Sequence, residues 1–220
     1  MLRTQFEKIK LNDDQLIFKE VEWSSILSTN EGKLFHNIKE NLSFLSLRKF
    51  IIHSFGDAIA YQKTGSPHDT YNLINNLIKT KYDELIAEGV DEIYFVAHSL
   101  GGVILSNFIY DSQTSGVDIQ FKKLFTFGTT IPLWTLKYKN FDSPIHLNEN
   151  QTWINMYDND DILGYPLGNI SPKYQDLVKA GKLIDIEVNS GTILTSWNPL
   201  CHLDYWTDKD VIKIIAGEVR

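Results

Sequence analysis

A serine between a predicted strand and a predicted helix is the feature that most constrains how this chain folds. Residues Glu92–Val96 have the apolar and aromatic content of a short buried strand, and Val103–Ile109 have that of a helix. The segment between them reads Ala97-His98-Ser99-Leu100-Gly101-Gly102. Its small residues let the backbone turn sharply and let neighbouring chain segments approach closely. The sequence therefore predicts a strand–turn–helix unit with Ser99 at the turn.

Ser99 stands where such a turn exposes a side chain. In this geometry the serine takes strained backbone angles, its hydroxyl stands above the strand ends, and the N-terminus of the helix lies beneath it. The usual pattern is Gly-x-Ser-x-Gly; here Ala97 takes the first glycine's place and Gly101 keeps the second. An ordinary loop between a strand and a helix is the alternative. We interpret the segment as a nucleophile elbow and Ser99 as a candidate nucleophile.

Strands and helices alternate along the rest of the chain. The predicted strands are Leu16–Trp23, Glu92–Val96, Phe121–Phe127, Trp153–Tyr157 and Leu183–Val188. The predicted helices fall within Glu31–Phe55, His68–Glu88, Val103–Asp111 and Asp208–Ala216. This order predicts the α/β class, with a mostly parallel central sheet flanked by helices and with active groups at the C-terminal ends of the strands. No repeat or linker divides the sequence, so we predict a single domain over residues 1–220.

Composition excludes several classes of function. Hydrophobic residues make up 43% of the 220 residues, charged residues 22%, and the net charge is −7. The basic residues are scattered, which argues against a nucleic-acid partner and against an anionic membrane surface. One cysteine allows no intrachain disulfide. Neither a signal peptide nor an apolar run of the roughly 20 residues that a membrane span needs is visible, so we predict a cytoplasmic protein without a transmembrane segment.

A serine nucleophile needs a histidine base, and the order of the chain narrows the choice. In the strand–turn–helix setting the order is serine, acid, histidine, so only histidines after Ser99 qualify. His146 precedes the acidic residues that follow the next strand, whereas His202 lies between the last predicted strand and the last predicted helix. A structural histidine is the alternative. We predict His202 as the base.

The acid comes from a run of aspartates after the strand Trp153–Tyr157. Asp158, Asp160 and Asp161 compete, and the others can cap turns. Asp161 precedes Ile162 and Leu163 and is the one expected to be half-buried, so we predict Asp161 as the acid, with Asp158 as the runner-up. The run lacks the fixed ligand spacing and distal glutamate of a calcium loop. We predict no metal site and no cofactor.

These segments together resemble the lipase- and esterase-like members of the α/β-hydrolase family. The resemblance rests on Ala97–Gly102, on Asp158–Pro166 and on His202-Leu203-Asp204-Tyr205-Trp206. The step Asp161-Ile162-Leu163 is similar to the Asp-Ile-Val-Pro step that carries the acid in fungal-type lipases, and Phe125–Leu133 resembles the strand and loop after the elbow helix. The resemblance implies the α/β-hydrolase fold, a Ser–Asp–His triad and transfer of an acyl group to water.

One element of that family is missing from the sequence. Its members usually begin with a strand ending in His-Gly, whose loop supplies a backbone amide to the oxyanion hole, and no His-Gly dipeptide occurs here. The strand Leu16–Trp23 looks like the family's next strand, so we expect the chain to lack the first one. The backbone N–H of Leu100 is then the one predicted oxyanion donor. Loss of the other would cost on the order of 10²–10³ in rate. Unpaired sheet edges would also offer a surface for oligomerisation.

The sequence therefore predicts a serine hydrolase that cleaves a small-molecule or lipid carboxylic ester. Ser99 would be the nucleophile, His202 the base, Asp161 the acid that orients it, and the Leu100 amide an oxyanion donor. Two other functions stay open. One is a binding or scaffold protein that keeps the fold with little or no catalysis, because of the missing His-Gly strand. The other is an acyltransferase with the same triad, in which an alcohol replaces water.

Overall fold

The computed structural model describes residues 4–6, 16–23, 26, 29–39, 43, 45–66, 68–137, 144–190 and 199–219. The chain divides into two compact units. One comprises Met1–Phe18 with Asp91–Arg220, and the other comprises Lys19–Val90. Each unit is described by itself below. A single domain over residues 1–220 stays a prediction.

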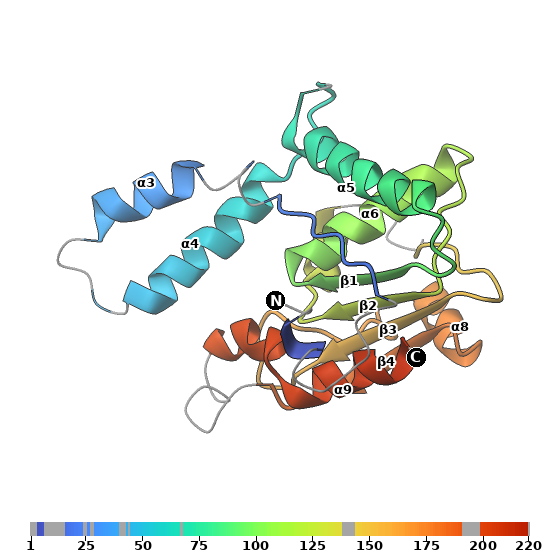
Figure 1. Cartoon of the computed structure of the whole chain (residues 1–220). Helices are drawn as coiled ribbons and strands as arrows, with labels where there is room; N and C mark the ends of the chain where they lie inside the picture. Colours follow the sequence, from blue (N-terminus) through green and yellow to red (C-terminus); the bar gives the residue numbers. More distant parts are fainter. Residues whose placement is uncertain are drawn as a thin grey trace. The chain divides into compact units, whose positions relative to one another are not determined.

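The unit built on Asp91–Arg220 contains a parallel sheet of four strands in the order β1-β2-β3-β4. Val96 lies beside Phe125, and Phe125 lies beside Ile154, so the three strands keep one register. The strands are β1 (Tyr94–His98), β2 (Lys123–Phe127), β3 (Thr152–Tyr157) and β4 (Leu183–Glu187). All four C-terminal ends therefore lie at one edge (Figure 1). The predicted parallel sheet and its α/β class are confirmed.

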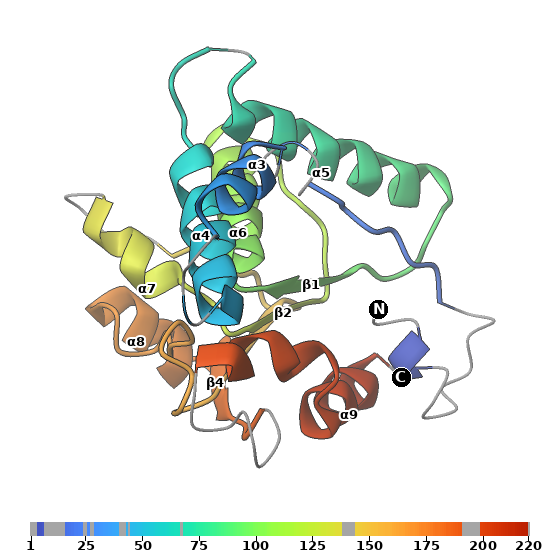
Figure 2. The ribbon, with the colours of Figure 1, turned by 90° about the vertical axis from the view of Figure 1, so that its left-hand side faces the viewer.

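Helices connect the strands and cover both faces of the sheet. Figures 1 and 2 show α6 on one side of β1 and β2, and α9 on the other side. The helical elements of this unit that follow β1 are α6 (Leu100–Thr114), α7 (Ile131–Trp134), η2 (Thr135–Lys137), α8 (Pro172–Lys179), η3 (Pro199–Trp206) and α9 (Lys209–Glu218). Connections through helices are what parallel strands require, because a short hairpin cannot join them.

The face covered by α9 holds an apolar core. Side chains alternate between the faces of a strand, so Phe125 and Phe127 of β2 point to the same side. Ile154 and Met156, their partners in β3, point there too. These four residues are at most 3% exposed. They pack with one stripe of α9, formed by Val211, Ile212, Ile215 and Ala216. The helical spacing of that stripe explains why the last segment forms a helix against the sheet.

The opposite face carries a buried polar network that fixes the loop after β3. The Trp153 indole N–H donates to the Thr126 hydroxyl at 2.9 Å, and that hydroxyl donates to the Asn155 carbonyl oxygen at 2.9 Å. The Asn155 amide donates to an Asp185 carboxylate oxygen at 2.7 Å. Asp185 also accepts the backbone N–H of Leu167. The Asn155 amide also donates to Tyr165 O at 3.0 Å, and Asp185 also accepts the Gly168 N–H at 2.7 Å, so the network anchors Tyr165 to β3 and Leu167 and Gly168 to β4.

The unit Lys19–Val90 is helical. Its helices are α3 (Thr29–Ile38), α4 (Leu45–Ala60) and α5 (Thr70–Ala87). Asp69 caps the N-terminus of α5 by accepting the backbone N–H of Asn72 at 2.8 Å, and it also accepts the Thr64 N–H at 2.7 Å. The rings of Tyr61 and Tyr71 stack with centroids 5.0 Å apart. The helix predicted over His68–Glu88 is therefore confirmed within two residues at each end.

One prediction of local structure is wrong, and the helix α8 lies where none was predicted. Residues 16–23 were predicted as a strand, but they contain neither helix nor strand. Leu16 and Phe18 instead pack their side chains against the core beside α9, so their apolar pattern reflects burial without pairing of the backbone. The helix α8 was not predicted. Its start is nevertheless encoded, because Ser171 caps it through the Tyr174 N–H and Pro172 occupies the first turn.

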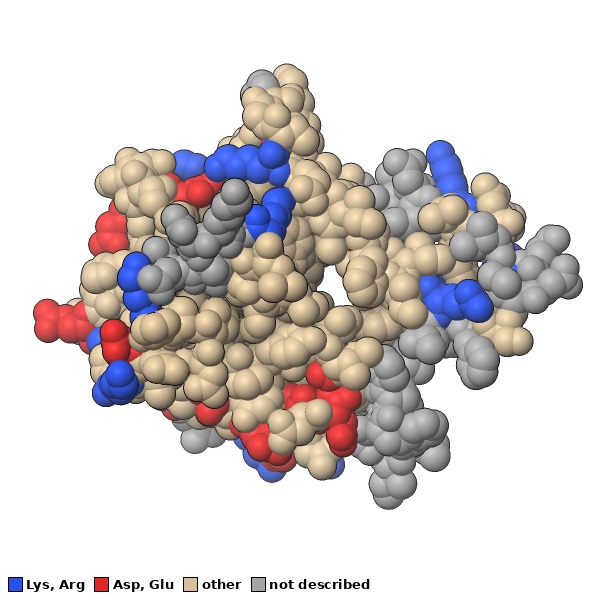
Figure 3. All heavy atoms as spheres, turned by 180° about the vertical axis from the view of Figure 1, so that it is seen from behind, with Lys and Arg blue, Asp and Glu red and all other residues tan. Residues whose placement is uncertain are grey.

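No helix among the described residues is long and apolar enough to cross a membrane. On the face shown in Figure 3, the described lysine and arginine side chains lie in several small groups separated by other residues.

Candidate active site

Ser99 occupies a strained turn between β1 and α6. Its φ is 54° and its ψ is −127°, and it is the one residue other than glycine with a positive φ in the described part of the chain. A side chain in this region costs about 1–3 kcal/mol and persists only where the surroundings enforce it. Two backbone bonds do so here. The Ser99 N–H donates to Phe127 O at 3.1 Å, and Ser99 O accepts the Gly102 N–H at 3.0 Å.

The structure explains the small side chains at two positions near Ser99. A Cβ on Gly102 would lie 2.5 Å from the Thr129 hydroxyl oxygen, so only glycine lets α6 approach the loop after β2. A Cβ on Gly101 would lie 3.8 Å from the Cβ of Ala97, which is ordinary contact. The elbow therefore accommodates the methyl group that stands in place of the first glycine of the usual pattern.

The structure brings Ser99, His202 and Asp161 into one hydrogen-bonded chain. The Ser99 Oγ lies 2.7 Å from His202 Nε2, and His202 Nδ1 lies 2.7 Å from Asp161 Oδ2. A carboxylate can only accept, so Nδ1 carries the imidazole proton and Nε2 is left to accept the Ser99 hydroxyl proton. His202 is 1% exposed and Asp161 is 3% exposed, whereas Ser99 is half-buried. Ser99 is therefore less buried than the two residues that follow it in the hydrogen-bonded chain.

Asp161 stays ionised in spite of its burial. Burial by itself raises the pKa of this carboxyl group, but hydrogen bonds outweigh it and leave the pKa below its ordinary value. The donors are the His202 imidazole, the Leu163 backbone N–H at 2.9 Å and the Tyr205 hydroxyl at 3.0 Å. A carboxylate held charged beside Nδ1 stabilises an imidazolium and fixes the tautomer of the ring.

Asp158 and Asp160, the other two aspartates of the run, do not hydrogen-bond to His202 in the contacts described here. Asp158, the runner-up, is 3% exposed and accepts the Ser190 N–H at 2.6 Å, the Ser190 hydroxyl at 3.1 Å and the Asp160 N–H at 2.8 Å. The Ser190 hydroxyl also lies 3.4 Å from the backbone oxygen of Cys201. Asp158 therefore links the loop after β3 to the segments after β4. The side chain of Asp160 is exposed.

His98, between Ala97 and Ser99, contacts His202 through both its ring and the His202 backbone. Its Nε2 lies 2.7 Å from the backbone oxygen of His202, and the two imidazole rings are 4.7 Å apart. A carbonyl only accepts, so Nε2 carries the proton and donates. Burial, with a smaller contribution from His202, lowers the pKa of His98 to about 3. The ring is thus neutral near pH 7 and adds no second charge beside the base.

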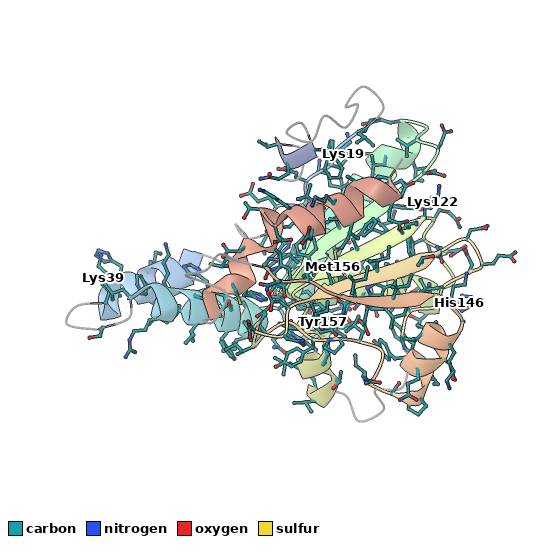
Figure 4. The ribbon with its side chains drawn as sticks, turned by 90° about the horizontal axis from the view of Figure 1, so that it is seen from below. Lys19, Lys39, Lys122, His146, Met156 and Tyr157 are labelled. Atoms are coloured by element: carbon teal, nitrogen blue, oxygen red, sulfur yellow. The ribbon has the colours of Figure 1, made fainter. Side chains whose placement is uncertain are left out.

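The remaining candidates lie elsewhere or cannot react. His146 exchanges backbone bonds of 2.9 and 2.8 Å with the Gln113 side chain, near the C-terminal end of α6. Ser99 precedes the other end of that helix, about 20 Å away by its length. Figure 4 likewise shows His146 and Lys122 toward the end of the sheet opposite Met156 and Tyr157. Burial, aided by nearby aspartates, raises the pKa of the Cys201 thiol to about 12, so it stays protonated.

Leu100 begins α6 directly after Ser99, the predicted nucleophile. The first backbone N–H groups of a helix have no partner within the helix, and the helix dipole places partial positive charge there. The predicted oxyanion donor therefore lies at a position suited to binding an anion. No group of three or more histidine, cysteine, aspartate or glutamate side chains that could hold a metal occurs among the described residues.

No model of a known protein family matches the chain, and no curated protein matches it either. The arrangement of Ser99, His202 and Asp161 therefore has to be judged on its own chemistry.

Sequence reasoning missed three residues that shape the site. Tyr205 contacts the acid, His98 contacts the backbone of the base, and Gly128 leaves room for both the acid and the base. Tyr205 lies three residues after His202, and Gly128 lies directly after β2. Their position at strand ends and beside the base was a usable signal, since groups at that edge of a parallel sheet converge.

Gly128 lies close to Tyr205, Asp161 and His202. Its φ is +54°, and a Cβ there would lie 2.8 Å from Tyr205 Cε2, 3.2 Å from Asp161 Oδ2 and 3.2 Å from His202 Cε1. We expect Gly128→Ala to lower the free energy of unfolding by about 2–4 kcal/mol, because backbone strain adds to crowding. Urea unfolding followed by circular dichroism measures this change.

Gly181→Ala is the matched control for Gly128→Ala. Gly181 has a φ of +67°, and nothing lies within 4 Å of the Cβ it would carry. Strain alone then acts, and we expect a loss of about 1–2 kcal/mol. Equal losses in the two variants would show that the space around the acid and the base is not restricted.

Proposed function

We propose that the protein is a serine hydrolase of the α/β-hydrolase type that cleaves carboxylic esters. The observation that carries the proposal is the chain of two 2.7 Å contacts from Ser99 Oγ through the His202 ring to Asp161 Oδ2. It begins at a serine with positive φ directly before α6, at the C-terminal edge of a parallel sheet. A structural role for Ser99 would not call for that strain.

In this proposal Ser99 Oγ attacks the ester carbonyl carbon while its proton passes to His202 Nε2. The resulting oxyanion accepts the Leu100 N–H at the first turn of α6. The imidazolium then gives its proton to the leaving alcohol as the carbon–oxygen bond of the ester breaks. Water, deprotonated by the same nitrogen, attacks the acyl group on Ser99, and the imidazolium returns that proton to Ser99 Oγ as the bond to the acyl group breaks and the acid leaves. Asp161 stays charged throughout and stabilises each imidazolium.

The substrate in this proposal is a small-molecule or lipid ester. Half-burial of Ser99 leaves its hydroxyl within reach of an acyl group that enters from solvent.

The nearby aromatic rings of His98, Phe127 and Trp206 pack against one another, with Trp206 edge-on to Phe127 at 4.8 Å. They give the base an apolar support, in which its charge-assisted hydrogen bonds are stronger than in water.

A fluorophosphonate probe tests the proposal. Ser99 Oγ bonds to the phosphorus of the probe, fluoride leaves, and the hydroxyl proton passes to His202, so only an activated serine reacts. We expect labelling of the full chain at Ser99, located by peptide mass spectrometry, and none in Ser99→Ala. Ser106→Ala is the control, because the Ser106 hydroxyl in the same helix is held by Val103 O at 3.1 Å.

Equal labelling of the chain and of Ser99→Ala would refute an activated Ser99. A folded protein that neither labels nor turns over short- and medium-chain esters would favour a binding or scaffold role. Product analysis with an added alcohol separates the remaining alternative, an acyltransferase, because a new ester then forms in place of the free acid.

A further inference from the structure

Tyr205 contacts the predicted acid, Asp161, at the same carboxylate oxygen as His202. Its hydroxyl donates to Asp161 Oδ2 at 3.0 Å, the same oxygen that accepts His202 Nδ1–H at 2.7 Å. The hydroxyl also accepts the backbone N–H of Asp158 at 2.9 Å. One hydroxyl thus joins the carboxylate to the backbone at the start of the acid loop.

The surroundings hold this hydroxyl in one place. Tyr205 is 0% exposed, and its ring stacks on Phe127 with centroids 5.8 Å apart. A Cβ on Gly164 would lie 2.9 Å from the Tyr205 oxygen and 2.5 Å from Asp161 Oδ2. The carboxylate and the hydroxyl are therefore enclosed together, with room for nothing larger than a hydrogen at position 164.

We infer that Tyr205 is a positioning residue, whose hydroxyl holds Asp161 toward His202 and sets how strongly the carboxylate attracts the imidazole proton. This inference rests on the proposed function. A carboxylate oxygen that accepts two donors shares its charge between them. Each hydrogen bond therefore weakens the oxygen's hydrogen bond to the other donor. Removing the hydroxyl makes Asp161 a stronger acceptor for His202 and leaves it less well oriented.

Other titratable groups face the same space and have their own partners. Asp158 is held by Ser190, His98 is neutral and bonded to the backbone of His202, and the Cys201 thiol stays protonated. None of them donates to Asp161 in the contacts described above. Among the hydrogen bonds described here, the Tyr205 hydroxyl is therefore the side-chain donor to Asp161 besides His202.

Tyr205→Phe tests the inference by keeping the ring and removing the hydroxyl. We expect kcat for ester hydrolysis to fall about tenfold with little change in KM. The acid limb of the kcat/KM profile should move to higher pH by about half to one unit, because a less shared carboxylate holds the imidazolium proton more tightly. Replacement of Tyr205 by a fluorinated tyrosine, a stronger donor, should move that limb to lower pH.

Tyr174→Phe is the matched control. Tyr174 is 4% exposed and its ring lies 6.3 Å from Trp153 on the face of the sheet away from α9, so it also loses a buried hydroxyl. We expect its acid limb to coincide with that of the unaltered protein. Coincident limbs for Tyr205→Phe as well, or shifts of the same sign for the phenylalanine and fluorotyrosine variants, would overturn the inference.

A second readout separates this inference from the proposed function. The carboxyl carbon of Asp161, labelled with carbon-13 and assigned with Asp161→Asn, reports its titration without any turnover. The Tyr205 hydroxyl is among the donors that lower the pKa of Asp161, so the pKa should rise in Tyr205→Phe and fall with fluorotyrosine. These shifts in a protein without Ser99-dependent turnover would reject the hydrolase and keep Tyr205. Their absence would reject the role of Tyr205.

Discussion

Replacing Ser99 by alanine is expected to lower kcat/KM for ester hydrolysis by a factor on the order of 10⁵–10⁶. The substitution removes the oxygen that forms the acyl-enzyme, while the Leu100 amide and the 2.7 Å contact between His202 and Asp161 are kept. Residual activity would then come from binding and oxyanion stabilisation alone. Initial rates on a soluble short-chain ester measure the loss.

Two measurements make the Ser99→Ala result decisive. Active-site titration of the unaltered protein shows which fraction of molecules reacts, and so excludes a trace contaminant as the source of activity. Ser106→Ala, which removes a hydroxyl from the same helix, should keep full activity. If Ser99→Ala turned over substrate within tenfold of the unaltered protein, Ser99 would not be the nucleophile.

Asp161→Asn is expected to reduce kcat by a factor on the order of 10⁴. The asparagine side chain fits the space, but one of its terminal atoms becomes a donor. The asparagine side chain then does not hold the proton on His202 Nδ1. The imidazole can take the other tautomer, in which Nε2 carries the proton and cannot accept the one from Ser99. Steady-state rates, with circular dichroism to verify folding, measure this effect.

Asp158→Asn is the matched control for Asp161→Asn, because both carboxylates are 3% exposed. Asp158 faces the Ser190 N–H and hydroxyl and does not contact the His202 ring in the hydrogen bonds described above. We expect Asp158→Asn to lose about 1–3 kcal/mol of stability, because the amide N–H₂ group would face the Ser190 donors. Its kcat should stay within about tenfold of that of the unaltered protein. If Asp158→Asn were inactive and Asp161→Asn active, Asp158 and not Asp161 would be the acid that orients His202.

The sheet could be predicted from sequence because its strands are short, apolar and separated by helical patterns. Each of β1 to β4 lies within two residues of its predicted bounds at either end. The segment 16–23 has a similar apolar content but no ladder of backbone bonds. Apolar content specifies burial, whereas a strand also needs a neighbour, and no local pattern reveals whether one is available.

Part of the candidate site could be predicted, because the expected order of serine, acid and histidine along the chain restricts which residues are candidates. Ser99 and His202 followed from the elbow and from the order of serine, acid and histidine, and the structure places their side chains in contact. The choice among three aspartates rested on expected burial, yet Asp158 is as buried as Asp161. What separates them is the direction of each side chain within the turn. That direction depends on Ser190 and Tyr205, which are remote in sequence.

The bridge from Asp158 to Ser190 has a consequence for how such a chain can diverge. Together with the Tyr205 hydroxyl, it joins the loop that carries the acid to the segments that flank the base. A substitution that shifts one of these segments must be matched in the other, so they are expected to change as a pair. Ser99 reaches the base from a different part of the fold. If the chain is the proposed hydrolase, its substrate preference can therefore change through loops outside the bridge while Asp161 and His202 keep their mutual geometry.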